Sequence, residues 1–262
     1  MHGISAVDAG NTIDWGRASR DYAAWRPDYP ASFYQRLAGL GVGLPGQRML
    51  DLGTGVGFLA RQFARQGALV AGTDVSAGQV DAARTAALAE ALAVDFQVAS
   101  AEAQPFAAGS FDVITASQCW LYFDLEPTLA EVRRLLAPGG VLVTAHFCWL
   151  PRLDPVAAAS EAIILCHSPN WSAADWDGHV PQVPAWAVGR AAVRHRLCYD
   201  EPIPFSHESW RGRIRASRGI GATLSPAQVD DFDVEHAAVL ADMCDDAFTV
   251  LHRIDAHVLT LP

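Results

Sequence analysis

The chain has 262 residues, 51% of them hydrophobic, and a formal net charge of −10. That length and apolar content suffice for one large α/β domain or for one domain with an insertion. The negative charge disfavours a nucleic-acid surface, because phosphate binding needs clustered cations. No apolar run is long enough to cross a bilayer, and no signal peptide is visible, so we expect no membrane partner.

All 19 basic residues are arginines, because the sequence contains no lysine. Mechanisms that need a lysine are therefore excluded: the P-loop, the Schiff base and the Tyr/Lys pair of short-chain dehydrogenases. The five cysteines are widely spaced, and none forms a CxxC pair. Reduced thiols in a cytoplasmic protein are the expected reading.

Short helices are expected before residue 47, over 16–25 and 31–40, separated by prolines at positions 27 and 30. Apolar strands then alternate with amphipathic helices, which is typical of a parallel sheet covered on both faces. The predicted strands are 48–52, 68–73, 94–98, 111–116 and 141–147, and the predicted helices are 58–66, 76–93 and 125–136.

The alternation breaks after residue 147. A helix is predicted over 154–166, followed by an irregular stretch at 167–188 that is rich in Trp, Pro, Asp and His. Strands at 194–205 and 249–259, with two helices between them, should form a terminal pair in the same sheet. We therefore expect a cofactor domain of residues 16–147 and 194–262, and a substrate-capping insertion of residues 148–193.

Three glycines at alternate positions, Gly53, Gly55 and Gly57, follow the first strand and precede a helix. Glycines tolerate φ > 0 and let a ligand approach the backbone, while a helix start attracts anionic groups. Asp74 lies about twenty residues further on, where an acid can accept hydrogen bonds from a ribose. Both NAD and S-adenosylmethionine carry such a ribose, so this pair alone leaves the choice open.

Several motifs in order favour S-adenosylmethionine over NAD. Residues 51–57 (DLGTGVG), 72–76 (GTDVS), 99–106 (ASAEAQPF), 111–114 (FDVI) and 136–142 (LAPGGVL) resemble those of class I S-adenosylmethionine-dependent methyltransferases. The resemblance implies a Rossmann-like seven-stranded sheet in the order 3-2-1-4-5-7-6, mostly parallel with the seventh strand antiparallel and helices on both faces. It also implies S-adenosylmethionine as cofactor and S-adenosylhomocysteine as product.

Within this family, residues 22–30 resemble the N-terminal segment of the ubiquinone/aconitate methyltransferase type, whose tyrosine and arginine close over the methionine end of the cofactor. The departure is at residues 119–124 (CWLYFD), where many relatives have an acidic or a His-Trp pair. The candidate cofactor-binding residues are Tyr22, Arg26, Asp51, Gly53, Thr54, Gly55, Gly57, Asp74, Val75, Gln79, Ser100, Ala101, Glu102, Ser117 and Gln118.

Methyl transfer is an in-line displacement that needs positioning and, where the nucleophile carries a proton, a base. His146 is the first candidate base, followed by His179 and His167, and no metal site is expected. A set of tryptophans indicates an aromatic-walled pocket for a planar or apolar small molecule: Trp149, Trp171, Trp176 and Trp186.

The expected function is thus methyl transfer from S-adenosylmethionine to O, N or C of a small organic metabolite. Two alternatives stay open: a fold that binds this cofactor but promotes a cyclisation or isomerisation, and an NAD(P)-dependent oxidoreductase. The latter usually has G-x-G-x-x-G spacing, whereas the third glycine here comes one residue early. The substrate, the accepting atom and the oligomeric state are not specified by the sequence.

Overall fold

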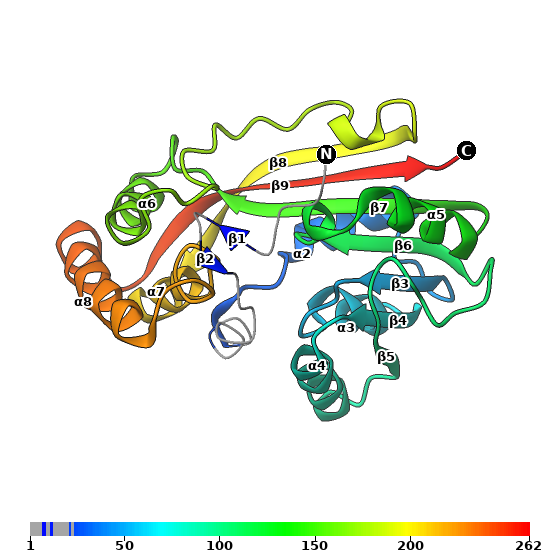
Figure 1. Ribbon diagram of the computed structural model, residues 1–262, viewed down its shortest axis with the longest axis horizontal. Coiled ribbons are helices and arrows are strands. Elements are labelled where there is room, and N and C mark those ends of the chain that lie inside the picture. Colours follow the sequence, from blue (N-terminus) through cyan, green and yellow to red (C-terminus); the bar gives the residue numbers. More distant parts are fainter. Residues whose placement is uncertain (1–6, 9–10, 13–20, 22–23) are drawn as a thin grey trace.

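A computed structural model describes residues 7–8, 11–12, 21 and 24–262. Tyr22 lies outside the described residues. A seven-stranded sheet runs through the molecule in the order β5-β4-β3-β6-β7-β9-β8 (Figure 1). Its strands are β3 (Arg48–Leu52), β4 (Leu69–Asp74), β5 (Val94–Val98), β6 (Phe111–Ser117), β7 (Leu136–Trp149), β8 (Ala192–Phe205) and β9 (Phe248–Thr260).

In sequence order within the sheet, this arrangement is 3-2-1-4-5-7-6, and the expected fold is confirmed. β9 lies between β7 and β8 and is antiparallel to both, while β3 to β7 pair in parallel. A small ribbon of β1 (Val7–Asp8) and β2 (Asn11–Thr12) precedes the sheet.

The helices are α2 (Ala31–Gly39), α3 (Phe58–Arg65), α4 (Ala77–Ala89), α5 (Leu125–Leu135), α6 (Pro155–His167), α7 (His207–Arg215) and α8 (Pro226–Met243), with 3-10 turns η1 (Trp120–Tyr122) and η2 (Ala185–Ala187). No described helix has the length and apolarity needed to traverse a lipid bilayer.

β7 differs most from the expected boundaries. It begins at Leu136 rather than 141, because Leu136 pairs with Phe111 before the register shifts at Val113. The Pro-Gly-Gly segment is therefore part of the strand. β7 also continues to Trp149, so His146 does not end it.

Strand side chains alternate between two apolar layers. Met49, Val113 and Phe147 belong to the layer that includes α2, α3 and α4, whereas Leu50, Ile114 and Leu142 face α5. The first layer continues without a break into residues of α6, α7 and α8.

α6, α7 and α8 gather beyond one end of the sheet and form a helical cluster (Figure 1). Ser160 of α6 joins the three helices: its Oγ accepts a hydrogen bond from Trp210 Nε1 at 2.9 Å and lies 2.9 Å from His236 Nε2. α7 also contacts the N-terminal segment, since a Cβ at Gly212 would lie 2.2 Å from Trp25. The excursion between β8 and β9 is thus packed against the insertion that follows β7.

The irregular segment before β8 covers the opposite face of β8 and β9. Arg196 donates a hydrogen bond to the Val180 carbonyl at 2.9 Å, and His257 Nε2 lies 2.9 Å from the Pro181 carbonyl. Trp186 packs on Trp120 with 4.7 Å between ring centroids. This coil therefore occupies the side of the sheet that α5 covers elsewhere.

Candidate functional site

The glycine turn after β3 has the positive φ angles that the sequence predicts. Gly53, Gly55 and Gly57 adopt φ values of 62°, 56° and 80°, which favour glycine over any residue with a Cβ. A Cβ at Gly57 would lie 2.7 Å from the Phe96 ring, and one at Gly53 would lie 2.8 Å from Cys119 Sγ. A side chain at either position would collide with these neighbours, so the turn requires glycine there.

Asp51, near the end of β3, stabilises this turn through its side chain. Its carboxylate accepts hydrogen bonds from Thr54 Oγ1 at 2.7 Å and from Thr115 Oγ1 at 2.6 Å. Burial raises the pKa of Asp51 to about 6, although the two threonine hydroxyls oppose the rise. The neighbouring strands β3 and β6 are thus joined at the base of the turn.

Asp74 lies at the end of β4 and faces the same turn. One carboxylate oxygen accepts a hydrogen bond from the Gly55 N–H at 3.0 Å, and the other accepts one from the Ser76 N–H at 2.9 Å. Burial raises its pKa, and these two backbone donors oppose the increase. These two hydrogen bonds hold the carboxylate beside the glycine backbone.

The remaining ribose- and adenine-side candidates surround this edge. Val75 is exposed, and Gln79, in the first turn of α4, is buried with its Oε1 unpartnered among the described residues. Ala101 is buried, and Glu102 accepts a hydrogen bond from the Asp124 N–H at 2.9 Å. A pocket of 510 Å³ lies beside this segment, lined in part by Val98, Glu102 and Gln104.

Ser117 ends β6 next to β7, and Gln118 follows it. Ser117 Oγ lies 2.7 Å from the hydroxyl of Tyr29, a residue that the sequence had not singled out from its proline-flanked segment. Gln118 has φ of 65° and donates a hydrogen bond from Nε2 to the Phe147 carbonyl at 2.8 Å. A left-handed residue other than glycine at a strand end is a frequent feature of functional sites.

Comparisons with known proteins agree with this geometry. A family model described as a methyltransferase domain matches residues 50–144. A ubiquinone biosynthesis O-methyltransferase of Xanthomonas campestris is 32% identical over 184 residues, which cover 67% of this chain and 73% of the relative. The chain belongs to the class I S-adenosylmethionine-dependent methyltransferases.

Other relatives match over shorter stretches. The methyltransferase GfsG of Streptomyces halstedii is 39% identical over 118 residues, but these cover only 44% of this chain and 42% of GfsG. The fold is shared with phosphoethanolamine N-methyltransferase 2 of Haemonchus contortus, solved with S-adenosylhomocysteine (TM-score 0.52, 22% identity, covering 93% of this chain and 57% of that one).

The cofactor of this methyltransferase family is S-adenosylmethionine, and the described residues fit it. Positive φ angles shape the glycine turn, Asp74 presents a carboxylate beside it, and Gln79 Oε1 is buried without a partner among the described residues. Of the two N-terminal candidates, Arg26 is described. Burial raises the pKa of Tyr29 and of Cys148, and the positive charge of Arg26 opposes both increases.

His146 lies near this site but on the other face of the sheet. Phe147 contacts Tyr29, with ring centroids 5.2 Å apart, and adjacent side chains of a strand point to opposite faces. His146 Nδ1 instead lies 3.0 Å from Asp255 of β9, whose side chain is buried. The structure thus does not bring His146 together with Tyr29 and Ser117.

The other two candidate bases lie apart from the glycine turn. His167 Nε2 is 3.1 Å from Glu235 of α8, within the helical cluster. His179 is exposed in the coil, where its N–H donates to Asp177 at 2.7 Å. Within the described ranges, no three His, Cys, Asp or Glu side chains gather in a way that could hold a metal ion.

The predicted tryptophan set divides between the two apolar layers. Trp149 contacts Trp171 and, from α7, Trp210, at 6.3 and 5.7 Å between centroids. Trp186 instead packs on Trp120 in the α5 layer, and Trp176 is half-buried in the coil. Trp149, Trp171, Trp210 and Phe205 form a buried aromatic cluster, which includes two of the four predicted tryptophans.

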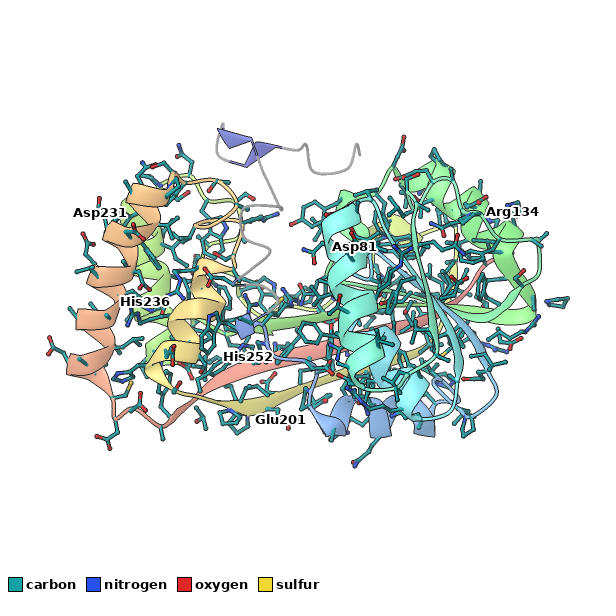
Figure 2. All side chains as sticks on the ribbon, turned by 90° about the horizontal axis from the view of Figure 1, so that it is seen from below. Asp81, Arg134, Glu201, Asp231, His236 and His252 are labelled. Atoms are coloured by element: carbon teal, nitrogen blue, oxygen red, sulfur yellow. The ribbon has the colours of Figure 1, made fainter. Side chains whose placement is uncertain are left out.

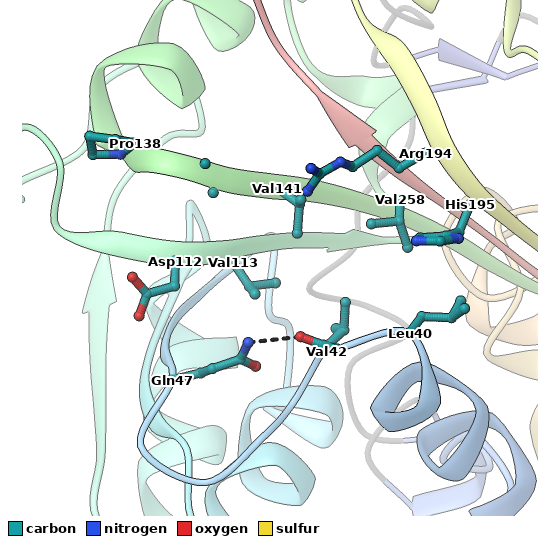
Figure 3. Close-up of a pocket in the computed structure, with 13 residues that line it drawn as sticks. Leu40, Val42, Gln47, Asp112, Val113, Pro138, Val141, Arg194, His195 and Val258 are labelled. Carbon is teal, nitrogen blue, oxygen red and sulfur yellow. Dashed lines mark hydrogen bonds between the residues drawn. The ribbon is translucent and has the colours of Figure 1, made fainter.

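A separate pocket of 340 Å³ lies at the amino ends of β6 and β7, away from the glycine turn. Figure 3 shows Val113, Val141 and Val258 in its wall, with Arg194 and His195 of β8 at its rim. Ligands of parallel α/β sheets bind at the carboxyl ends of the strands. This pocket is therefore distinct from the cofactor site.

Proposed function

We propose that this methyltransferase moves a methyl group from S-adenosylmethionine to O, N or C of a small organic molecule held beside the ends of β6 and β7. One observation carries the proposal: a run of contacts links the cofactor edge to an aromatic cluster. Ser117 contacts Tyr29, and Tyr29 contacts Phe147. The acceptor would lie on this face, next to the methionine end of the cofactor.

The acceptor side favours a planar or apolar substrate, because aromatic side chains dominate it. Trp210 and Phe205 are 4.8 Å apart between centroids, and Trp210 and Trp149 are 5.7 Å apart. The relative named for ubiquinone biosynthesis is an O-methyltransferase, which favours oxygen as the accepting atom. We propose that the capping unit comprises residues 150–191 together with 206–247, since Ser160 bonds to α7 and lies beside His236 of α8.

Each cofactor-side residue has a distinct proposed role. Asp74 would accept hydrogen bonds from the ribose, and the glycine turn would let the cofactor approach the backbone. Glu102 and Ala101 would border the adenine, while Arg26 would pair with the methionine carboxylate. S-adenosylmethionine supplies an electrophilic methyl group on a sulfonium, so the chain's main task is to align the acceptor with it.

His146 stays a prediction as general base, with His179 and His167 after it. Its position on the far face of β7 favours a structural role, in which its Nδ1 interacts with the Asp255 carboxylate. The five free cysteines support a reducing compartment such as the cytoplasm.

Two measurements test the function. S-adenosylhomocysteine should bind at micromolar concentrations, and methyl-labelled S-adenosylmethionine should transfer its label to a component of a metabolite extract. Failure to bind the product would reject the cofactor site. Binding without any transfer of label, but with conversion of an extract component, would favour a cyclisation or isomerisation instead.

A further inference from the structure

His252 of β9 is a buried histidine whose tautomer the structure fixes. Its Nδ1 lies 2.9 Å from the Val250 carbonyl oxygen, which can only accept a hydrogen bond, so Nδ1 carries the proton. Nε2 is then the acceptor nitrogen of a neutral ring. The side chain is 1% exposed.

Aromatic rings surround this imidazole. Phe147, Phe205 and Trp210 lie 4.9, 5.7 and 6.0 Å from it between centroids. Arg213 of α7 is also buried, with its guanidinium 4.9 Å above the Trp149 ring. Burial lowers the pKa of His252 to about 3; the hydrogen bond to Val250 opposes this, and the charges of Arg213 and Arg26 reinforce it. The ring is therefore neutral at physiological pH.

Nε2 has no hydrogen-bond partner among the described residues. A buried acceptor without a partner costs about 1–3 kcal/mol, so such atoms in a folded protein call for an explanation. His236 offers a comparison: it is buried and also has one unpartnered ring nitrogen, but it lies inside the helical cluster. Figure 2 shows His252 on β9 between that cluster and the part of the sheet that carries α4.

The position of His252 relates it to the cofactor edge. Phe147 lies between the two: its ring is 5.2 Å from Tyr29 on one side and 4.9 Å from His252 on the other. Tyr29 in turn contacts Ser117 at the end of β6. An acceptor molecule lying along Phe147 could thus reach both the methionine end of the cofactor and Nε2.

We propose that His252 Nε2 accepts a hydrogen bond from an O–H or N–H group of the methyl acceptor and thereby orients it. This inference rests on the proposed function and assigns a substrate-contacting residue to it. The substrate enters by displacing side chains that cover the ring. Its donor group forms a hydrogen bond to the unpartnered Nε2, and the aromatic rings pack against its planar part. A substrate with a donor is therefore preferred over the same molecule without one.

The direct test uses phenol and anisole; anisole keeps the ring and the oxygen but carries a methyl group in place of the O–H hydrogen. With S-adenosylhomocysteine at saturation and ¹⁵N-labelled histidine, phenol should shift the His252 Nε2 resonance and anisole should not. The inference is overturned if phenol leaves this resonance unchanged up to its solubility limit, or if anisole shifts it equally.

Two variants separate the ring nitrogens. His252→Asn retains a donor near Nδ1 but removes Nε2, and should weaken phenol binding at least tenfold. His252→Gln extends an amide toward the Nε2 position and should retain most of the affinity. His236→Asn removes a buried histidine elsewhere and is the control for destabilisation. Equal affinities for phenol in His252→Asn and His236→Asn would overturn the inference.

Activity distinguishes this inference from the function on which it rests. If label transfer occurs, His252→Asn should lower turnover of the identified acceptor by about 10²-fold with S-adenosylhomocysteine affinity unchanged within twofold. If no extract component is methylated while phenol still shifts Nε2, the methyl-transfer proposal fails and the assignment of His252 to a donor-binding site stands.

Discussion

At the scale of single residues, two carboxylates hold the glycine turn and its neighbouring strands in place through hydrogen bonds. Asp51 holds Thr54 and Thr115, and Asp74 holds the N–H groups of Gly55 and Ser76. Each carboxylate is largely removed from water, so burial raises both pKa values. Carboxylates whose pKa is shifted by burial are frequent at functional sites.

The change Asp74→Asn keeps the size of the side chain and removes its charge. Since hydrogen bonds to charged groups contribute about 1.5–3 kcal/mol, affinity for S-adenosylhomocysteine should fall by roughly tenfold to hundredfold. Titration calorimetry measures the loss, and circular dichroism checks the fold. Asp81→Asn is a matched control, because Asp81 is exposed on α4 and pairs only with Arg84 among the described residues. Equal affinity in both variants would refute the ribose assignment.

At the scale of elements, the Ser160 hydroxyl links α6, α7 and α8 inside the apolar core of the helical cluster. Ser160 Oγ donates to the Val156 carbonyl at 2.8 Å, and so the hydrogen on His236 Nε2 points at Ser160 Oγ. Burial lowers the pKa of His236 to about 4. The His236 ring between α6 and α8 is therefore neutral at physiological pH.

This depressed pKa predicts a pH dependence of stability. Between pH 6.5 and 4 the unfolded chain protonates His236 and the folded chain does not, so the free energy of unfolding falls as the pH falls. The wild type should lose roughly 1 kcal/mol per pH unit relative to His236→Asn over this window. Urea unfolding at pH 7, 6 and 5 measures the difference. Parallel pH profiles for the two proteins would contradict the prediction.

At the scale of the whole molecule, one apolar layer connects the cofactor side to the helical cluster. It includes Phe63 of α3, Phe147 of β7, Ile254 of β9 and Phe232 of α8. β7 and β9 extend from the parallel strands to the cluster, so the two parts share long strands rather than a linker. We therefore expect them to unfold together.

A single cooperative transition should be seen by calorimetry, with equal calorimetric and van't Hoff enthalpies. S-adenosylhomocysteine at 100 times its Kd should add about 2.7 kcal/mol and raise that one transition. Replacing the other tryptophans with phenylalanine isolates the fluorescence of Trp210. This signal would report whether the helical cluster unfolds in the same transition. Two transitions, of which the ligand shifts only one, would show that the parts unfold separately.

Much of the cofactor side could be predicted from the sequence because its groups lie in short local motifs. The glycine turn, Asp51 and Asp74 each follow a predicted strand, and parallel strands bring their carboxyl ends to one edge. Tyr29 was within reach of the same reasoning, since it lies between two prolines in a singled-out segment. The boundaries of β7 were not, because the Pro-Gly-Gly segment has the composition of a turn.

The aromatic cluster on the proposed acceptor side depends on tertiary structure. His146 and Phe147 are neighbours in the sequence, yet the alternation of β7 sends them to opposite faces. Trp210, Phe205 and His252 come from α7, β8 and β9, and no spacing in the chain relates them. The sequence by itself determined the cofactor and the edge of the sheet at which it is expected to bind, because the motifs at the strand ends are local. Only the packing of distant strands and helices decided which histidine lies beside the aromatic cluster, because that contact depends on long-range register.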